Sequence, residues 1–157
     1  GLNVAQLLLT NEDFSTPNRI LNVTNTFENL LRHDDVIPIV NENDSVATEE
    51  LKFGDNDSLS ASLSILIKAA LLIILTEVDG LMDEDGNVIS DISDIDEVSK
   101  HVRSGIGSYS VGGMSTKLEA LAMAAGSGVP ALIANGRNFD QLPDLINGGG
   151  VCSRITL

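Results

Sequence analysis

The chain has 157 residues, a formal net charge of −14, 43% hydrophobic residues and only 3% aromatic ones. A chain of this length and hydrophobic content can bury one substantial core, and the shortage of aromatic residues favours an aliphatic α/β interior over disorder. The negative charge argues against nucleic acid as a partner, because phosphate backbones are held by Lys and Arg, of which the chain has 9.

Cysteine and histidine are too scarce to build a metal site of their own. Cys152 is the single cysteine, which excludes an internal disulfide and fits a reducing cytosol, and His33 and His101 stand alone. The start of the chain lacks the features of a signal peptide. The longest apolar run, Ala69 to Leu75, is far shorter than the roughly 20 residues that span a bilayer. We therefore expect a cytoplasmic protein without a membrane partner.

Strand and helix signals alternate along the chain. Apolar residues at helical spacing, such as Ile20, Val23 and Phe27, predict helices, and uninterrupted aliphatic runs predict strands. In chain order the predicted elements are strand 4–9, helix 17–33, strand 36–40, helix 58–69, strand 71–75, an exposed hairpin turn at 83–87, an acidic helix at 91–102, a loop at 104–113, helix 114–125, strand 129–134, helix 140–146 and an edge strand at 151–157.

The fold class follows from this alternation. The runs Leu71 to Leu75 and Val129 to Ala134 are almost wholly apolar, which indicates strands covered on both faces. We therefore predict an α/β fold, a three-layer α/β/α sandwich with a mainly parallel sheet.

Polar clusters follow three of the predicted strands. They begin at Asn41, at Thr76 and at Asn135, and the carboxyl ends of parallel strands share one edge of a sheet, where α/β proteins bind ligands. A further cluster, Gly54 to Asp57, precedes a helix and could bind a polar substrate or a metal, or simply form a turn and an N-cap. An EF-hand calcium site is disfavoured because the required spacing is missing.

The segment Gly112-Gly113-Met114-Ser115-Thr116-Lys117 has the composition of an anion-binding loop. Two glycines allow backbone N–H groups to approach an anion, and a lysine in the first turn of the following helix can reach the same oxygens. The order of residues differs from the Walker pattern, so a flexible hinge before a helix is the alternative.

Four sequence blocks, N-E-N-D-S-V-A-T, G-D-N-D-S-L-S-A, L-T-E-V-D-G-L and G-G-M-S-T-K, resemble in their order and spacing the amino acid kinase family, specifically its glutamate 5-kinases. The resemblance runs from Leu7 to about Gly150. It implies ATP-dependent phosphorylation of the γ-carboxylate of L-glutamate, the first step towards proline, with Mg²⁺ bridging phosphate oxygens. It also implies feedback inhibition by proline and a homo-oligomer.

The resemblance assigns roles to the polar residues. Asp57 would orient the catalytic lysines, and Lys117 would stabilise charge on the transferred phosphoryl group. The glutamate pocket would comprise two contacting residues, Asp44 and Asn56, and two shaping residues, Asn41 and Asp55. The nucleotide would be held by Thr76, Glu77, Gly112, Gly113, Met114 and Lys117. We expect Asp44, Asn56, Asp57, Thr76 and Lys117 to line one cleft.

The chain also departs from the family pattern. Glu77 stands where the family more often has Asp, Val111 replaces a small or hydroxylated residue, and residues 151–155 match the usual ending poorly.

Family members carry a strand with a catalytic lysine and a phosphate loop ahead of the position of Leu7. We therefore interpret the chain as the carboxyl-terminal part of one kinase domain, with 1–70 belonging to the glutamate-binding half and 71–157 forming the nucleotide lobe. We expect it to be inactive alone. Two alternatives stay open: a non-catalytic nucleotide-binding fragment, and another family member such as a uridylate or carbamate kinase.

Overall fold

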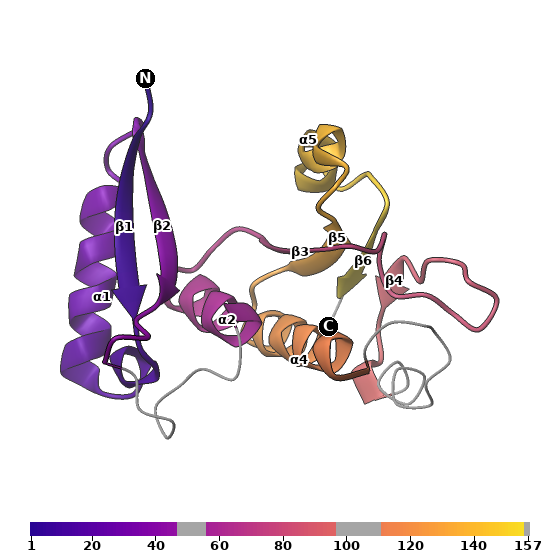
Figure 1. The fold of residues 1–157 in the computed structure, drawn as a ribbon, viewed down its shortest axis with the longest axis horizontal. Helices are drawn as coiled ribbons and strands as arrows, with labels where there is room; N and C mark the ends of the chain where they lie inside the picture. Colours follow the sequence, from indigo (N-terminus) through magenta and orange to yellow (C-terminus); the bar gives the residue numbers. More distant parts are fainter. Residues whose placement is uncertain (47–55, 97–110, 156–157) are drawn as a thin grey trace. The chain divides into compact units, whose positions relative to one another are not determined.

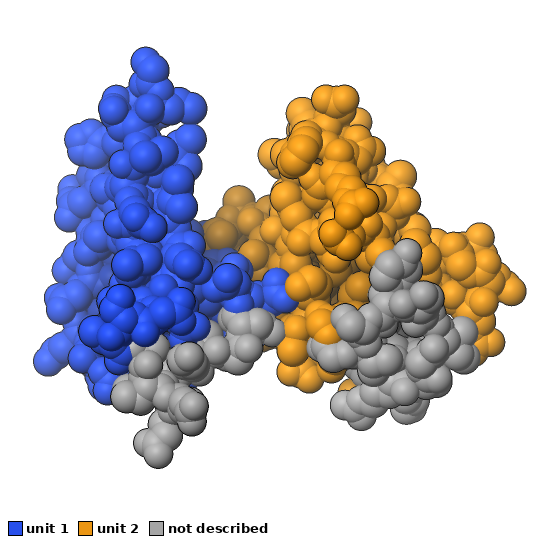
Figure 2. Space-filling view, viewed as in Figure 1, with its two compact units in different colours: residues 1–68 blue, residues 69–157 orange. Residues whose placement is uncertain are grey.

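The computed structural model describes residues 1–46, 56–96 and 111–155. It divides into two compact units, Gly1–Lys68 and Ala69–Leu157, which are coloured separately in Figure 2. Within the described ranges, no helix combines the length and the apolar character needed to cross a bilayer. Asp55, residues 97–102 of the predicted acidic helix and residues 104–110 of the predicted loop lie outside these ranges.

The first unit is a strand-helix-strand motif followed by another helix (Figure 1). Its two strands run parallel, with Leu7 opposite Val40 and Leu9 opposite Glu42. A parallel pair needs a long crossover, and the helix between the strands supplies it. Its elements are β1 (Asn3–Leu9), the 3₁₀ helix η1 (Asn11–Phe14), α1 (Pro17–Leu30), β2 (Val36–Glu42) and α2 (Asn56–Leu66).

Both α-helices of the first unit contribute to one apolar core. Leu9 of β1, Val23 and Phe27 of α1, and Leu59 of α2 form a buried cluster. The helical stripe predicted for residues 17–33 therefore does face the core. Because side chains alternate along a strand, Ile37 lies on the opposite face of the sheet, and it is 45% exposed.

The second unit contains a four-stranded sheet in the order β3-β5-β6-β4. The pairs β3/β5 and β4/β6 are parallel, whereas β5/β6 is antiparallel. With the parallel β1/β2 pair, the strand pairing is mainly parallel, as predicted. The elements are β3 (Leu72–Thr76), β4 (Asp91–Ile92), α4 (Val111–Gly126), β5 (Ala131–Asn135), the 3₁₀ helix η2 (Phe139–Gln141), α5 (Leu142–Ile146) and β6 (Cys152–Ile155).

Helices cover both faces of this sheet. Leu132 and Ala134 of β5 pack with Leu145 of α5 in one buried cluster. The α4 helix contacts β3, β5 and β6, and Figure 1 shows α4 and α5 on opposite sides of the sheet. Residues 131–134 of β5 are all buried, which explains why this strand is apolar throughout. The predicted α/β/α layering is confirmed.

Two predictions for the second unit need correction. The predicted acidic helix starts too early: Asp91 and Ile92 form β4, where Ile92 pairs opposite Ile155 and is only 1% exposed, and helix is found at residues 95–96. The sheet, rather than a helix, buries the apolar side chain of this acidic segment. The last strand is not at an edge, because β6 lies between β5 and β4. The short side chains Cys152 and Ser153 suggest an exposed edge strand in the sequence, but both are buried in the structure.

The predicted hairpin turn at 83–87 is confirmed. The Asp83 carboxylate accepts hydrogen bonds from the backbone N–H groups of Asp85 and Asn87, at 3.0 and 2.8 Å. Met82 and Val88 form an antiparallel bridge at its base. The aspartate therefore serves the turn itself, as turn-forming aspartates commonly do.

Candidate functional site

The first group of predicted site residues lies where β2 ends. Asn41 is the second-last residue of β2, Asp44 lies in the turn that follows, and both residues are exposed. The Asn43 N–H donates to the Leu9 carbonyl at 2.8 Å, which ties this segment to the end of β1. An amide and a carboxylate are thus presented at the carboxyl end of a parallel pair, the usual location of a ligand site in α/β proteins.

Asn56 and Asp57 open α2. The first backbone N–H groups of a helix have no acceptor within the helix, and a carboxylate in the first turn complements the positive end of the helix dipole. Ser60 Oγ donates to the Asn56 carbonyl at 2.7 Å. This position gives Asp57 a role in the helix, which is compatible with the further role that the resemblance assigns to it.

In the second unit, Thr76 and Glu77 lie at the end of β3. Thr76 is the last residue of the strand, and its carbonyl accepts the Gly136 N–H at 2.8 Å. Glu77 follows it and pairs through Oε1 with Arg137 Nη2 at 2.8 Å. Two of the polar clusters predicted to converge, those beginning at Thr76 and at Asn135, therefore do meet at one edge of the sheet.

The glycine pair lies in a helix rather than in a loop. Because α4 begins at Val111, Gly112, Gly113 and Met114 belong to its first turn, and Lys117 lies in the second turn rather than the first. Gly113 and Lys117 are four residues apart, so they share one side of the helix. The N–H groups of the first turn are free of intrahelical acceptors, so the anion-binding interpretation survives this correction.

The structure thus groups the predicted residues within each unit. Those assigned to glutamate lie in the first unit and those assigned to the nucleotide lie in the second. The further expectation that they line one cleft stays a prediction.

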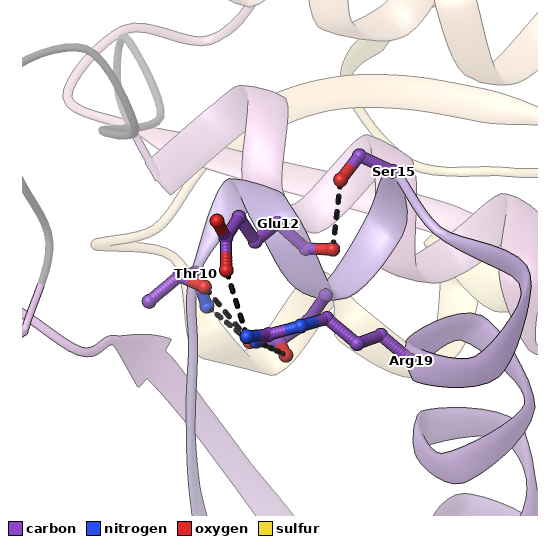
Figure 3. Close-up of polar contacts among 5 residues, drawn as sticks. Thr10, Glu12, Ser15 and Arg19 are labelled. Atoms are coloured by element: carbon purple, nitrogen blue, oxygen red, sulfur yellow. Dashed lines mark hydrogen bonds and ion pairs between the residues drawn. The ribbon is translucent and has the colours of Figure 1, made fainter.

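A network that the sequence analysis missed lies at the end of β1 (Figure 3). The Asp13 Oδ2 atom accepts the Thr10 N–H at 2.7 Å and the Thr10 hydroxyl at 3.0 Å. Arg19 bridges Asp13 Oδ1 at 3.0 Å and Glu12 Oε2 at 2.8 Å. The spacing of Thr10 and Asp13, three residues apart before a helix, is a capping-box signal that could have revealed it.

These residues border a hollow of about 350 Å³ within the first unit. It is lined by Leu8, Thr10, Glu12, Asp13, Arg19, Asn43 and Val46. Because Asn43 belongs to the polar segment after β2, the network supports the same end of the sheet that carries Asn41 and Asp44.

Asp13 should make the protein sensitive to acid. Burial raises the pKa of the Asp13 carboxyl, but the hydrogen bonds from Thr10 and Arg19 outweigh it, so this pKa lies below its ordinary value of 3.8. Since the pKa is depressed by folding, the stabilisation is complete above 3.8 and is lost as the pH falls through the folded-state value. Replacing Asp13 with Ala should lower the free energy of unfolding near neutral pH by about 1 kcal/mol, measured by urea titration.

The matched control is Glu12→Ala. Glu12 pairs with the same arginine, but both side chains are largely exposed, so its loss should cost about 0–1 kcal/mol. The deficit of Asp13→Ala should shrink as the pH falls below 3.8, because the unfolded wild-type protein then takes up a proton at Asp13 before the folded protein does. A deficit that stays constant down to pH 2.5 would contradict the assignment.

The fold and the positions of these groups define an α/β protein with polar side chains at the carboxyl ends of its strands, where α/β proteins usually bind ligands. Residues 1–135 match the amino acid kinase family. The chain belongs to this family.

Curated relatives give the similarity in more detail. The chain is 44% identical over 154 residues to glutamate 5-kinase of Clostridium acetobutylicum, an alignment covering 94% of this chain and 57% of that protein. It is 46% identical over 144 residues to glutamate 5-kinase of Caldanaerobacter subterraneus, covering 87% of this chain and 38% of that protein. The chain therefore spans about half, or less, of the length of these relatives.

Solved structures agree on the fold. N-acetylglutamate synthase from Neisseria gonorrhoeae matches with a TM-score of 0.65 and 18% identity, over 85% of this chain and 30% of that one. UMP kinase from Ureaplasma parvum matches with a TM-score of 0.55 and 12% identity, over 100% of this chain and 58% of that one. At such identities the similarity shows the shared fold alone.

Proposed function

We propose that this chain is the carboxyl-terminal part of an enzyme that transfers the γ-phosphoryl group of ATP to the γ-carboxylate of L-glutamate, giving γ-glutamyl phosphate, the first intermediate towards proline. The observation that carries the proposal is the 44% identity to a glutamate 5-kinase over 94% of this chain. The positions of the polar groups at strand and helix ends support it. Feedback inhibition by proline and a homo-oligomeric state belong to the same proposal.

The first unit would bind glutamate. This substrate carries one ammonium group and two carboxylates at neutral pH. The Asp44 carboxylate suits the ammonium group, and the amides of Asn41 and Asn56 can donate to a carboxylate. Asp57, at the amino end of α2, would orient the catalytic lysines, and Asp55 would shape the same pocket.

The second unit would bind ATP. A chain with a net charge of −14 repels a polyphosphate, so local donors must overcome the overall field. Lys117 and the first-turn N–H groups of Gly112, Gly113 and Met114 supply such donors. Thr76 and Glu77 would contact the nucleotide at the end of β3. Mg²⁺, which is usually held through substrate phosphates and water, would enter with the nucleotide and offset phosphate charge.

The chemistry places few demands on the protein. The substrate carboxylate is itself the nucleophile and is already ionised at neutral pH, so the enzyme needs no general base to activate it. Catalysis then consists of aligning the carboxylate with the terminal phosphate and stabilising the charge on the transferred group. Lys117 is the described residue best suited to the second task.

A hydroxamate assay tests the proposal. A full-length enzyme that carries this segment should form γ-glutamyl hydroxamate from L-glutamate, ATP, Mg²⁺ and hydroxylamine, because hydroxylamine traps an acyl phosphate. Parallel reactions with uridylate and carbamate, followed by the ADP that each transfer releases because phosphorylated uridylate forms no hydroxamate, test the alternative family members. Equal or greater turnover with either of them would overturn the glutamate assignment, and ATP binding without turnover of any acceptor would favour the non-catalytic alternative.

A further inference from the structure

The segment from Thr76 to Leu81 is fastened at both ends to neighbouring strands of the second unit. At its start, the Thr76 carbonyl accepts the Gly136 N–H at 2.8 Å. At its end, the Leu81 N–H donates to Ser153 Oγ at 2.8 Å, and Ser153 is fully buried. Gly80 is required there, since a Cβ atom at this residue would lie 2.6 Å from Ser153 Oγ. The stretch between these anchors includes Glu77, which the proposed function assigns to the nucleotide.

Asn135 fastens the middle of this segment. It is the last residue of β5 and lies opposite Thr76 in the parallel pair. Its Nδ2 donates to Asp79 Oδ1 at 2.8 Å, and its Oδ1 accepts the Arg137 N–H at 2.9 Å. Because both ends of the amide are engaged, the Asn135 side chain is held in one orientation, with its donor directed at Asp79.

The two carboxylates of the segment are both engaged by residues at, or just after, the end of β5. Asp79 accepts from Asn135, and Glu77 pairs with Arg137. Both carboxylates would otherwise be free to turn towards a bound polyphosphate and repel it. The Glu77–Arg137 pair is highly exposed and is therefore weak, whereas the Asn135 amide combines a donor to a carboxylate with a fixed geometry.

We propose that Asn135 is a positioning residue of the nucleotide site. It holds the Asp79 carboxylate, and through it the backbone from Thr76 to Asp79, in the arrangement that receives ATP. This inference rests on the proposed function only in taking the ligand of the second unit to be a nucleotide. It requires no contact between Asn135 and the nucleotide itself.

An exchange of the two side chains tests it in the full-length enzyme. Asn135→Asp places a second carboxylate against Asp79, and the repulsion between them should move the segment from Thr76 to Asp79 out of position. The KM for ATP should therefore rise about tenfold or more, the change expected for losing a hydrogen bond to a charged group. The KM for glutamate should change less than about threefold. The double variant Asp79→Asn with Asn135→Asp restores one donor facing one carboxylate, and it should return the KM for ATP to within about threefold of wild type.

Asn138→Asp is the matched control, because it adds the same charge three residues away. Asn138 is the N-cap residue of η2, and its side chain makes no capping hydrogen bond that the substitution could remove. It should leave the KM for ATP nearly unchanged. The melting temperature of each variant shows whether the protein is still folded, so a displaced segment from Thr76 to Asp79 can be distinguished from unfolding. Calorimetric titration with ATP in the absence of glutamate separates this inference from the proposed substrate, because the Asn135→Asp defect and its rescue should appear there even if glutamate is not phosphorylated. Unchanged ATP affinity in Asn135→Asp, or failure of the exchange to rescue a folded protein, would overturn the inference.

Discussion

Replacing Lys117 with Ala in a full-length enzyme that carries this segment should lower kcat by about a hundredfold or more, like the loss of one preorganised electrostatic donor. The KM for glutamate should change much less. The Lys117 ammonium group is proposed to stabilise the charge on the transferred phosphoryl group in the transition state, and it is not assigned to the glutamate pocket. Steady-state kinetics with saturating ATP would measure both constants.

Lys68→Ala provides a control for the general loss of a positive charge. Lys68 is an exposed lysine that follows α2, and it has no assigned role in the site. Its removal should leave kcat within about twofold of wild type, as for most surface substitutions. If Lys117→Ala retained the kcat of Lys68→Ala, Lys117 would have no catalytic role and the start of α4 would be merely structural.

Replacing Asp44 with Ala should act on the other substrate. Removing a charged hydrogen-bonding partner typically costs about 1.5–3 kcal/mol, so the KM for glutamate should rise about tenfold to a hundredfold. The KM for ATP should stay close to wild type, because the nucleotide is assigned to residues of the second unit. Initial rates over a matrix of glutamate and ATP concentrations would separate the two effects.

Asp34→Asn is the control for this variant. Asp34 is exposed in the turn before β2, at the amino end of the strand rather than the carboxyl end. The Asp34→Asn substitution removes the same charge without touching the proposed pocket. The KM values for glutamate and ATP should both be preserved. An Asp44→Ala enzyme with an unchanged KM for glutamate would remove Asp44 from the substrate site.

The main elements could be predicted because local signals and tertiary packing agree. Pro17 at the start of α1 and the stripe containing Val23 and Phe27 specify both the beginning and the buried side of that helix. The apolar run of β5 specifies a strand covered on both faces. These features act within a few residues, so a single sequence displays them.

The errors arise where distant residues decide the structure. Asp91 and Ile92 are a strand only because β6, some sixty residues later, pairs with them, and no local pattern of two residues can reveal this. Ser153 is polar but central, because its hydroxyl satisfies the Leu81 N–H across the sheet. The link from Asn135 to Asp79 spans 56 positions of sequence and was equally hidden.

Part of the candidate site could also be predicted from the sequence, because local signals locate the ends of strands and helices. Its residues stand at strand and helix ends, which local signals locate, so the prediction that the clusters at Thr76 and Asn135 converge is met in the structure. The start of α4 was misplaced because Gly112 and Gly113 are poor helix formers and resemble a loop in sequence. Helical glycines at the amino end keep their backbone accessible, which suits the anion-binding role proposed for them.

Transfer of an oxygen label tests the central claim most directly. The full-length enzyme would be incubated with ATP, Mg²⁺ and L-glutamate carrying ¹⁸O in its γ-carboxylate, and the released phosphate would be examined by ³¹P NMR. If the carboxylate attacks the terminal phosphorus of ATP, one of its oxygens becomes the bridging atom of γ-glutamyl phosphate. Attack of the substrate's own amine on the carbonyl carbon then expels that oxygen with the phosphate as the ring closes. The proposed function predicts phosphate bearing one ¹⁸O atom, formed only when glutamate is present. Unlabelled phosphate, released at the same rate with or without glutamate, would contradict it.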